Sequence, residues 1–300
     1  MRVAYLGPAG TYSEEALRAS APAAVEEVPY PTIHVAVMAV QEGAVDRAVV
    51  PIENALEGAV AVTLDTLALE ATGVRISAEV VHPIHHCVVA AGQLELDEVT
   101  RIVSHPQATA QCERFLRERL AHAERVVAPS TADAVLSVRD AREPAVALAS
   151  RLAAELYDCI VLAANVEDHP DNATRFVWLA PASEIGDPGT EAKTSVVFWG
   201  GGDQAPGWLV DVLREFADRG VNLTRIESRP RRVRLGHYMF FADLEGAATT
   251  PPVSEALDAL RDRVEEIRVL GSYTSVGGGA GYTGRHHGGT RGPGRRNRGG

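Results

Sequence analysis

The amino-acid sequence predicts an α/β fold in two domains, and three observations support this prediction. Along the first 180 residues one unit recurs, in which a short apolar strand ends in a polar or glycine-containing turn and a helical stretch follows. A segment at 182–193 has the Gly, Pro and charged residues of a linker. Beyond the linker the predicted elements change to the order βαββαβ. Strands that alternate with helices indicate an α/β domain with a largely parallel sheet.

Four strand-and-turn units organise the first domain. In such sheets, ligands bind beyond the carboxyl ends of the strands, close to helix N-termini that favour anions. Helix starts are marked by Thr11 with Glu14 and by Ser130 with Asp133, which fit a capping box, and by Pro106 at a first-turn position. The strands are residues 3–6, 48–52, 101–103 and 145–149, followed by turns at 7–13, 53–54, 104–107 and 150–151.

The second domain has a different pattern. Its strands are short and partly aromatic, and its two helices are amphipathic. The order βαββαβ predicts the ferredoxin-like split βαβ arrangement, and small domains of this kind often pair through their sheets. The predicted strands are 195–199, 222–228, 237–244 and 267–270, and the predicted helices are 207–219 and 252–264.

Composition restricts the partners and the compartment. The 300 residues carry a net charge of −11, which argues against nucleic acid as a main partner. Three widely spaced cysteines, Cys87, Cys112 and Cys159, form no disulfide framework, so a reducing compartment is expected. The N-terminus shows no apolar signal segment, and no uncharged run is long enough to span a bilayer. We therefore expect a cytoplasmic protein without a membrane contact.

The C-terminal residues 273–300 are predicted to be disordered. Residues 271–300 contain five arginines, no acidic residue and many glycines, so they cannot bury an apolar surface. A tail of this composition can contact single-stranded nucleic acid. A dispensable tail is the favoured interpretation.

A candidate substrate site lies where the polar loop at 171–173 meets an apolar strand. Thr174, Arg175 and Phe176 place a hydroxyl, a guanidinium and an aromatic ring at this junction. Arginine can hold a carboxylate through two parallel hydrogen bonds, threonine can donate to an oxygen, and phenylalanine can pack on a ring. The group suits a small anionic substrate with a ring and a hydroxyl. The structural alternatives are a turn threonine, an arginine in a salt bridge and a core phenylalanine.

Neither a nucleotide nor a metal ion is predicted. The glycine turn at 7–10 matches neither GxGxxG nor a Walker loop. The one metal-like cluster consists of His82, His85, His86 and Cys87. These residues lie in a stretch that reads as a strand crossing between two lobes, and strand alternation would send His85 and His86 to opposite faces.

Five short motifs occur in one order along the chain. They are Gly-Pro-Ala-Gly-Thr-Tyr-Ser at 7–13, Val-Pro-Ile-Glu-Asn at 50–54, Ser-His-Pro-Gln-Ala at 104–108, Thr-Arg-Phe at 174–176 and Glu-Ser-Arg-Pro at 227–230. Together they resemble prephenate dehydratase with a C-terminal ACT regulatory domain, over residues 1 to about 272. The resemblance implies a two-lobed catalytic region like a type II periplasmic binding protein, followed by the ACT domain. The implied boundaries are 1–76 with 164–181 for lobe one, 77–163 for lobe two, and 194–272 for the ACT domain.

The resemblance also implies an activity. Family members convert prephenate to phenylpyruvate, carbon dioxide and water in L-phenylalanine biosynthesis, as hydro-lyases that need no cofactor. Because the chain starts with the first strand, we expect it to be monofunctional. Thr174 is the implied catalytic threonine, with Glu53 or His105 as the acid that it orients. For Thr11 and Ser104, helix capping is the alternative to substrate binding. The expected substrate-binding residues are Thr11, Asn54, Ser104, Gln107, Asn172, Arg175 and Phe176.

The expected effector is L-phenylalanine at the ACT domain, in a homodimer or homotetramer. Trp208 departs from the family pattern, which has alanine there, so it could fill the effector pocket, line another pocket or turn outward. Ala55 also departs, from the serine that commonly follows Glu-Asn. The expected effector-binding residues are Gly207, Trp208, Leu209, Glu227, Ser228, Arg229 and Pro230.

Two alternatives remain open at the level of the sequence. Arogenate dehydratase performs the same elimination on a substrate that differs in one substituent. A non-catalytic sensor would couple a binding cleft to an amino-acid-binding domain, although the intact Thr174-Arg175-Phe176 motif argues against it.

Overall fold

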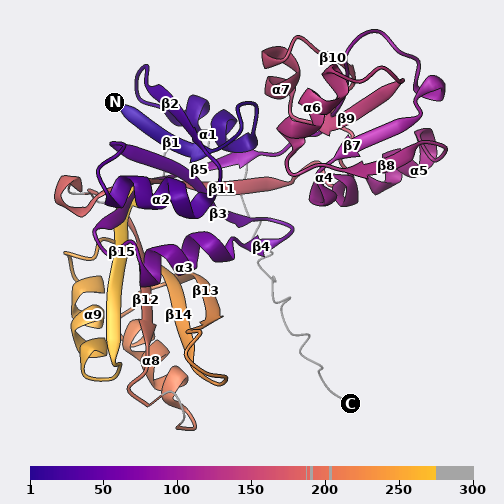
Figure 1. Ribbon diagram of the computed structural model, residues 1–300. Coiled ribbons are helices and arrows are strands. Elements are labelled where there is room, and N and C mark those ends of the chain that lie inside the picture. The colour runs from indigo at the N-terminus through magenta and orange to yellow at the C-terminus, as the bar shows by residue number, and fades with distance from the viewer. Residues whose placement is uncertain (187, 190–191, 203–204, 275–300) are drawn as a thin grey trace, which may run out of the picture.

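The computed structural model describes residues 1–186, 188–189, 192–202 and 205–274. Three β-sheets define three bodies, which are two α/β lobes and a C-terminal α/β domain (Figure 1). Within these ranges no helix is both long and apolar enough to cross a membrane. Linker positions 187 and 190–191 lie outside the described residues. The tail was predicted to be disordered from 273, but residues 273 and 274 belong to the last strand, and the remainder from 275 lies outside the described residues.

The first lobe is built on a mixed sheet. Its strand order is β2-β1-β3-β11-β5, and β4 pairs with the end of β3. β1 is parallel to β2 and β3, whereas β11 runs antiparallel to β3 and β5, so the expectation of a largely parallel sheet is wrong here. Its elements are β1 (Arg2–Leu6), α1 (Tyr12–Ser20), β2 (Glu26–Tyr30), α2 (Ile33–Gln41), β3 (Arg47–Asn54), β4 (Gly58–Ala59), α3 (Ala61–Leu69), β5 (Val74–Pro83) and β11 (Ala173–Pro181).

The second lobe has a mixed sheet of order β10-β6-β9-β7-β8. The apolar strand β9 lies at its centre and is buried along its full length. The helical stretch expected to follow the turn at 104–107 is divided into two at Cys112. Its elements are β6 (Cys87–Ala90), η1 (Leu96–Glu98), β7 (Arg101–Ser104), α4 (Pro106–Gln111), α5 (Glu113–Arg119), β8 (Glu124–Val127), α6 (Thr131–Arg139), β9 (Ala145–Ala149), α7 (Arg151–Leu156) and β10 (Ile160–Ala163).

Two segments, 84–86 and 164–172, connect the lobes. The boundary expected after residue 76 falls inside β5, because that strand pairs with β11 from Val74 to Pro83. The continuous crossing strand expected around His85 is also absent, since β5 ends at Pro83 and β6 begins at Cys87.

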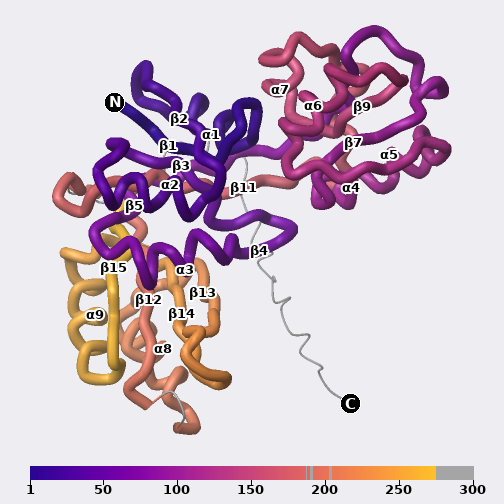
Figure 2. The backbone as a smooth tube through the Cα atoms, in the orientation of Figure 1, coloured from indigo at the N-terminus to yellow at the C-terminus, as the bar shows by residue number. Residues whose placement is uncertain are grey.

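The C-terminal domain has the predicted order βαββαβ, and this prediction is confirmed. Its antiparallel sheet has the order β13-β14-β12-β15. One face packs against α8 and α9, and the other contributes Val197, Phe241 and Tyr273 to a core shared with the first lobe, beneath α3 (Figure 2). Its elements, after the short η2 (Ala182–Glu184), are β12 (Ala192–Trp199), α8 (Trp208–Ala217), β13 (Leu223–Pro230), β14 (Tyr238–Glu245), α9 (Val253–Arg261) and β15 (Glu266–Thr274).

The helix caps differ in how well the sequence predicts them. Ser130 caps α6 as expected, because its hydroxyl accepts from the Asp133 N–H at 2.9 Å. Pro106 is the first residue of α4, also as expected. The capping box predicted at Thr11 is wrong: the Thr11 hydroxyl donates to the Leu6 carbonyl, and the Glu14 carboxylate accepts from the backbone of a neighbouring glycine.

Candidate active site

A cavity of about 320 Å³ lies between the two lobes. This is at the lower end of the range for small-molecule sites. Three of the four predicted turns reach it, whereas the fourth, at 150–151, contacts the other lobe instead. The lining residues are Leu6, Thr11, Tyr12, Ser13, Ile33, Pro51, Asn54, Val60, Ile84, His86, His105, Gln107, Ala108, Gln111, Pro129, Ser130, Thr131, Thr174 and Phe176.

The lining contains no lysine or arginine, yet three helices begin at the cavity. These are α1, α4 and α6, whose cap or first-turn residues Thr11, His105 and Ser130 all line it. The first N–H groups of a helix have no intrahelical partner, and the helix dipole adds a partial positive charge there. The cavity is therefore suited to anionic groups through oriented N–H groups rather than through a cationic side chain.

The Thr174 hydroxyl has a defined orientation. The Asn54 side-chain oxygen accepts from the backbone N–H groups of Leu56 and Glu57, both at 3.0 Å, so the amide nitrogen must face the other way. That nitrogen donates to the Thr174 hydroxyl oxygen at 2.9 Å. Among the described residues the Thr174 hydroxyl has no acceptor of its own. Its proton is thus available to a molecule in the cavity.

A chain of amides and one imidazole extends this arrangement across the cleft. Asn54 also donates to the Asn172 side-chain oxygen at 3.0 Å, and Asn172 donates to Gln111 at 3.0 Å. The Gln111 oxygen lies 3.0 Å from Nε2 of His86, which must therefore carry a proton. Nδ1 of His86 lies 2.8 Å from the Tyr12 hydroxyl. Residues of both lobes and both connecting segments thus determine the position of Thr174.

Burial shifts the pKa values of two side chains in this series of hydrogen bonds, His86 and Tyr12. Burial lowers the pKa of His86 below its ordinary value, although the bond to Gln111 opposes this shift. Burial also raises the pKa of the Tyr12 hydroxyl, and nearby carboxylates add to the effect. Both groups are therefore neutral at physiological pH, and they act as hydrogen-bonding groups rather than as charges.

His105 is the N-cap residue of α4 and lines the cavity. Its Nδ1 accepts from the Gln107 N–H at 3.3 Å, which requires a lone pair on that nitrogen. A ring that caps in this way carries its proton on Nε2. With Nδ1 accepting from the backbone, the N–H at Nε2 is the donor that His105 can offer to the cavity.

Strand alternation separates the residues of two motifs. Asn54 and Thr174 are cross-strand partners that line the cavity, while Glu53 and Arg175 are the next pair and do not line it. Arg175 lies 3.3 Å from Glu53, and both side chains contact residues of the C-terminal domain. The expectation that Arg175 clamps a substrate carboxylate and that Glu53 supplies a proton is corrected on this basis, because both face away from the cleft.

The remaining predicted substrate residues divide into two groups. Thr11, Gln107 and Phe176 line the cavity. Phe176 is also buried in the core, so it has both the substrate-facing position and the core position that the sequence offered as alternatives. Ser104 does not line the cavity and donates to the Leu148 carbonyl at 2.9 Å. Asn172 is likewise buried behind the lining, where it supports Asn54 and Gln111 rather than reaching the cavity.

The metal-like cluster is divided among different partners. His82 contacts Glu15 at 3.0 Å and His85 contacts Glu167 at 2.7 Å, while His86 belongs to the chain described above. In the described ranges no group of three or more His, Cys, Asp or Glu side chains is arranged to hold a metal ion.

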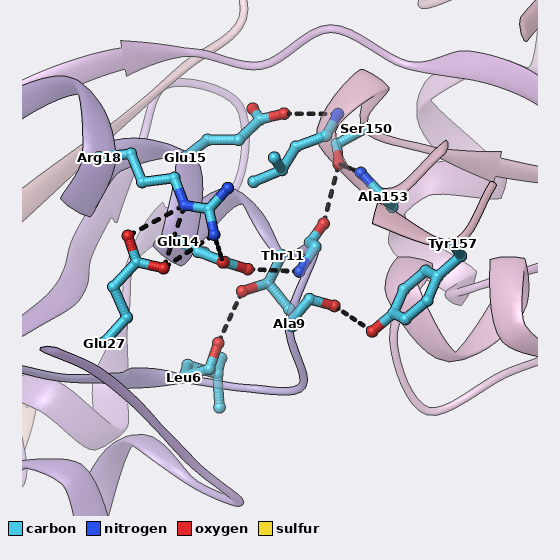
Figure 3. Close-up of polar contacts among 12 residues, drawn as sticks. Leu6, Ala9, Thr11, Glu14, Glu15, Arg18, Glu27, Ser150, Ala153 and Tyr157 are labelled. Carbon is cyan, nitrogen blue, oxygen red and sulfur yellow. Dashed lines mark hydrogen bonds and ion pairs between the residues drawn. The ribbon is translucent and has the colours of Figure 1, made fainter. Parts of the chain in front are cut away.

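The loop at 7–11 touches the second lobe directly (Figure 3). The Ser150 hydroxyl donates to the Gly10 carbonyl at 2.8 Å, and the Tyr157 hydroxyl donates to the Ala9 carbonyl at 2.6 Å. Gly10 has φ of +89°, and a Cβ there would lie 2.9 Å from the Ala153 backbone. Glycine is thus required both for the backbone conformation and for the close approach of α7.

The predicted effector residues lie on α8 and β13. Trp208 neither turns outward nor stands free, because its indole packs near Phe198 and Phe240 and donates to the Arg263 carbonyl at 2.9 Å. Arg229 is held by Asp65 of α3 through two bonds of 2.7 and 3.0 Å. Gly207 is the N-cap residue of α8, with φ of +88°, and Leu209 packs against the domain core. On β13, Ser228 and Pro230 are exposed, while Glu227 and Arg229 are partly buried.

Several lining residues were not identified from the sequence. Gln111 lies four residues after Gln107 in the same helical segment, so helical periodicity was a usable signal. Tyr12 lies within the first glycine motif. His86 was considered only as a metal ligand, and Ser130 only as a cap. Their proximity depends on the closure of two lobes and has no local signature.

Comparison with known proteins agrees with this geometry. A family model for prephenate dehydratase matches residues 3–184, and a model for the ACT domain matches residues 194–262. A prephenate dehydratase of Amycolatopsis methanolica is 39% identical over 278 residues, which cover 92% of this chain and 90% of that protein.

Solved structures agree as well. The prephenate dehydratase of Arthrobacter aurescens in complex with L-Phe has a TM-score of 0.83 and 37% identity, over 91% of this chain and 90% of that one. GqqA, described as a novel type of quorum quenching acylase, has a TM-score of 0.82 and 33% identity, over 92% of this chain and 98% of that one.

The fold and the cavity together define a two-lobed α/β protein with a cleft between the lobes and a C-terminal ACT domain. Its matches extend over both domains and cover nearly the whole chain of several relatives. The chain belongs to the prephenate dehydratase family.

Proposed function

We propose that the protein converts prephenate to phenylpyruvate, carbon dioxide and water, as a hydro-lyase of L-phenylalanine biosynthesis. The observation that supports this most directly is Thr174, whose hydroxyl accepts from Asn54 and keeps its own proton free in an anion-compatible cavity. Family membership supports the same reaction.

The proposed chemistry is an elimination driven by the substrate. The bond between the ring and its carboxylate breaks, its electron pair enters the ring, and the ring hydroxyl departs as hydroxide, which takes up one proton from the medium to become water. Thr174 would donate a hydrogen bond to the departing oxygen, with His105 as a second donor. The N-termini of α1 and α6 would hold carboxylates. Closure between the lobes would keep bulk water from the ring while carbon dioxide leaves.

The test is turnover by the purified protein. We expect phenylpyruvate to form from prephenate without any added cofactor. Arogenate serves as a second substrate, and faster turnover of arogenate would assign the protein to arogenate dehydratase. Amide hydrolysis of an acylated quorum signal checks the acylase described for GqqA. Phenylalanine binding without turnover of any substrate would favour the non-catalytic sensor and overturn the proposal.

We also propose L-phenylalanine as an effector and a homo-oligomer as the active form. Support for the effector comes from the ACT domain and from a relative solved in complex with L-Phe. Support for self-association comes from β13, an edge strand of its sheet with an exposed Ile226. Sedimentation or scattering measurements of the mass in solution would distinguish monomer, dimer and tetramer.

We further propose a cytoplasmic location. The three unpaired cysteines agree with a reducing compartment.

A further inference from the structure

Two consecutive residues of strand β11 face different parts of the molecule. Thr174 pairs across the strands with Asn54 and faces the cavity. Arg175 pairs with Glu53 on the next rung and faces the C-terminal domain. A register shift follows at once, between Arg175 and Phe176. The residue that presents the free hydroxyl is thus adjacent to the residue that contacts the ACT domain.

An interdomain ion-pair network surrounds Arg175. Each domain contributes both signs of charge, and three acids face three bases across the boundary. Nη2 of Arg175 lies 2.7 Å from Oδ2 of Asp243 on β14, and its Nη1 donates to Glu79 on β5 at 3.2 Å. The network consists of Glu53, Glu79 and Arg175 from the catalytic region, and Lys193, Arg225 and Asp243 from the ACT domain.

The central groups of this network are removed from water. The side chains of Arg175, Glu79 and Asp243 are 11%, 3% and 2% exposed. Burial by itself lowers the pKa of Arg175, but Asp243 and its neighbours raise it above its ordinary value, so the guanidinium stays charged. Removing one member of a buried ion pair leaves its partner uncompensated, which makes such a network sensitive to single changes.

The contact between Arg175 and Asp243 depends on charge. Its two atoms lie within ion-pair distance, 2.7 Å apart, in a site that is almost closed to water. Asp243 also accepts from the Ser195 hydroxyl at 2.6 Å, which fixes the carboxylate within the ACT sheet. A neutral asparagine at 243 retains the shape and can keep the bond to Ser195, yet it loses the attraction to Arg175.

We propose that Arg175 is a positioning residue for Thr174 and that Asp243 of the ACT domain holds it in place. By pairing with Glu53, Arg175 fixes the rung next to Thr174 and Asn54, just before the irregularity where the strand register shifts. A conformational change of the ACT domain is thereby transmitted to the Thr174 hydroxyl through strand β11. This inference rests on the proposed dehydratase reaction.

The test is the steady-state kinetics of Asp243→Asn with prephenate, in the absence of phenylalanine. We expect kcat to fall by roughly tenfold, because a misplacement on the order of 1 Å at a reacting group costs up to about 10²-fold. KM should change by less than about twofold, since no residue of the cavity lining is altered. Arg175→Lys, which keeps the charge, should retain more kcat than Arg175→Met.

A matched control is Asp65→Asn. Asp65 is a buried carboxylate of the catalytic region that pairs with Arg229 across the same domain boundary, but from α3 rather than from β11. We expect its kcat without phenylalanine to remain at the wild-type value. Thermal unfolding of each variant separates loss of folding from loss of positioning.

Three outcomes would overturn the inference. They are a folded Asp243→Asn protein with unchanged kcat, a change confined to KM, and an equal loss of kcat in Asp65→Asn. A wild-type protein that turns over neither prephenate nor arogenate would instead overturn the proposed function, so the two failures are distinguishable.

Discussion

At the scale of single residues, the position of one hydroxyl proton follows from amide orientations. Two backbone N–H groups fix the Asn54 amide, and that amide donates to the hydroxyl oxygen of Thr174. Threonine is a weak acid, so its contribution is a hydrogen bond that strengthens as negative charge develops on the leaving oxygen. The other donors at the cavity, Gln111 and His105, are likewise oriented by their neighbours.

Thr174→Ala removes the donor proposed to act on the departing hydroxyl. We expect kcat to fall by about 10² or more, which is the scale of losing one transition-state donor. Phenylpyruvate formation, measured at saturating prephenate, checks this. Turnover close to the wild-type value would remove Thr174 from the mechanism. Thr174→Ser retains the hydroxyl and should keep most of the activity.

His86 predicts a pH dependence of stability. Burial lowers its pKa in the folded protein below the ordinary value of 6.5, so the neutral ring stabilises the fold fully above that pH. As the pH falls below 6.5 the unfolded chain binds the proton first, and stability is lost by up to about 1.4 kcal/mol per pH unit until the folded pKa is reached. Tyr12, Glu15, His85 and Glu167 are titratable groups that contact His86 or act on its charge.

The check is denaturant unfolding at pH 7 and at pH 5.5 for wild type and for His86→Gln. We expect the free energy of unfolding to decrease less between the two pH values in the variant than in the wild type. His122→Gln, a change at an exposed histidine of the second lobe, is the control and should behave like wild type. An identical pH dependence in all three proteins would show that His86 does not contribute.

At the scale of elements, the loop between β1 and α1 controls how closely the lobes approach. It sends Thr11 to the cavity and places two carbonyls against α7 (Figure 3). The helix termini supply the anion-binding groups, and strand alternation decides which motif residues face the cleft. Both effects belong to whole elements, so neighbouring residues of one motif have different roles.

Gly10→Ala tests the loop contact. The new Cβ would meet the Ala153 backbone at 2.9 Å in a positive-φ conformation, so we expect a loss of stability above 1 kcal/mol and a weaker kcat/KM. Gly43→Ala is the matched control, since Gly43 also has positive φ, at +70°, but a Cβ there meets nothing within 4 Å. Unfolding and prephenate kinetics of both variants separate backbone strain from lobe contact. Equal effects in both would contradict a role for the approach to α7.

At the scale of the whole molecule, the ACT sheet and the first lobe share one hydrophobic core and at least two sets of buried ion pairs. Such an interface ties the conformation of one domain to that of the other. Allosteric control requires only that phenylalanine distinguishes two arrangements of this contact.

Linkage predicts that phenylalanine and prephenate affect each other's binding equally. If phenylalanine inhibits by weakening substrate binding, prephenate must weaken phenylalanine binding by the same factor. Calorimetry on the Thr174→Ala variant, where prephenate would be consumed about 10²-fold more slowly, measures phenylalanine affinity with and without substrate. We expect a lower affinity in the presence of prephenate, and L-alanine as ligand is the control. An unchanged affinity would exclude this form of coupling.

The sequence by itself determined part of the elements and the family. Apolar periodicity and turn residues predicted strands β1, β3, β7 and β9, the βαββαβ domain and the Ser130 cap, because these depend on local hydrogen bonds and burial. Five motifs in order indicated the family, which the comparisons confirmed.

Only the tertiary structure decided which motif residues share the cavity. Glu53 and Arg175 were expected in the site, yet β3 extends through Glu53, and alternation turns both side chains toward the C-terminal domain. Their partners there, Arg225 and Asp243, lie 172 and 68 residues away in sequence (225 − 53 and 243 − 175). Gln111 and His86 join the site only because two lobes close on each other. The physical reason is that a side chain's direction follows from its own strand, whereas its partners come from distant segments that no local pattern specifies.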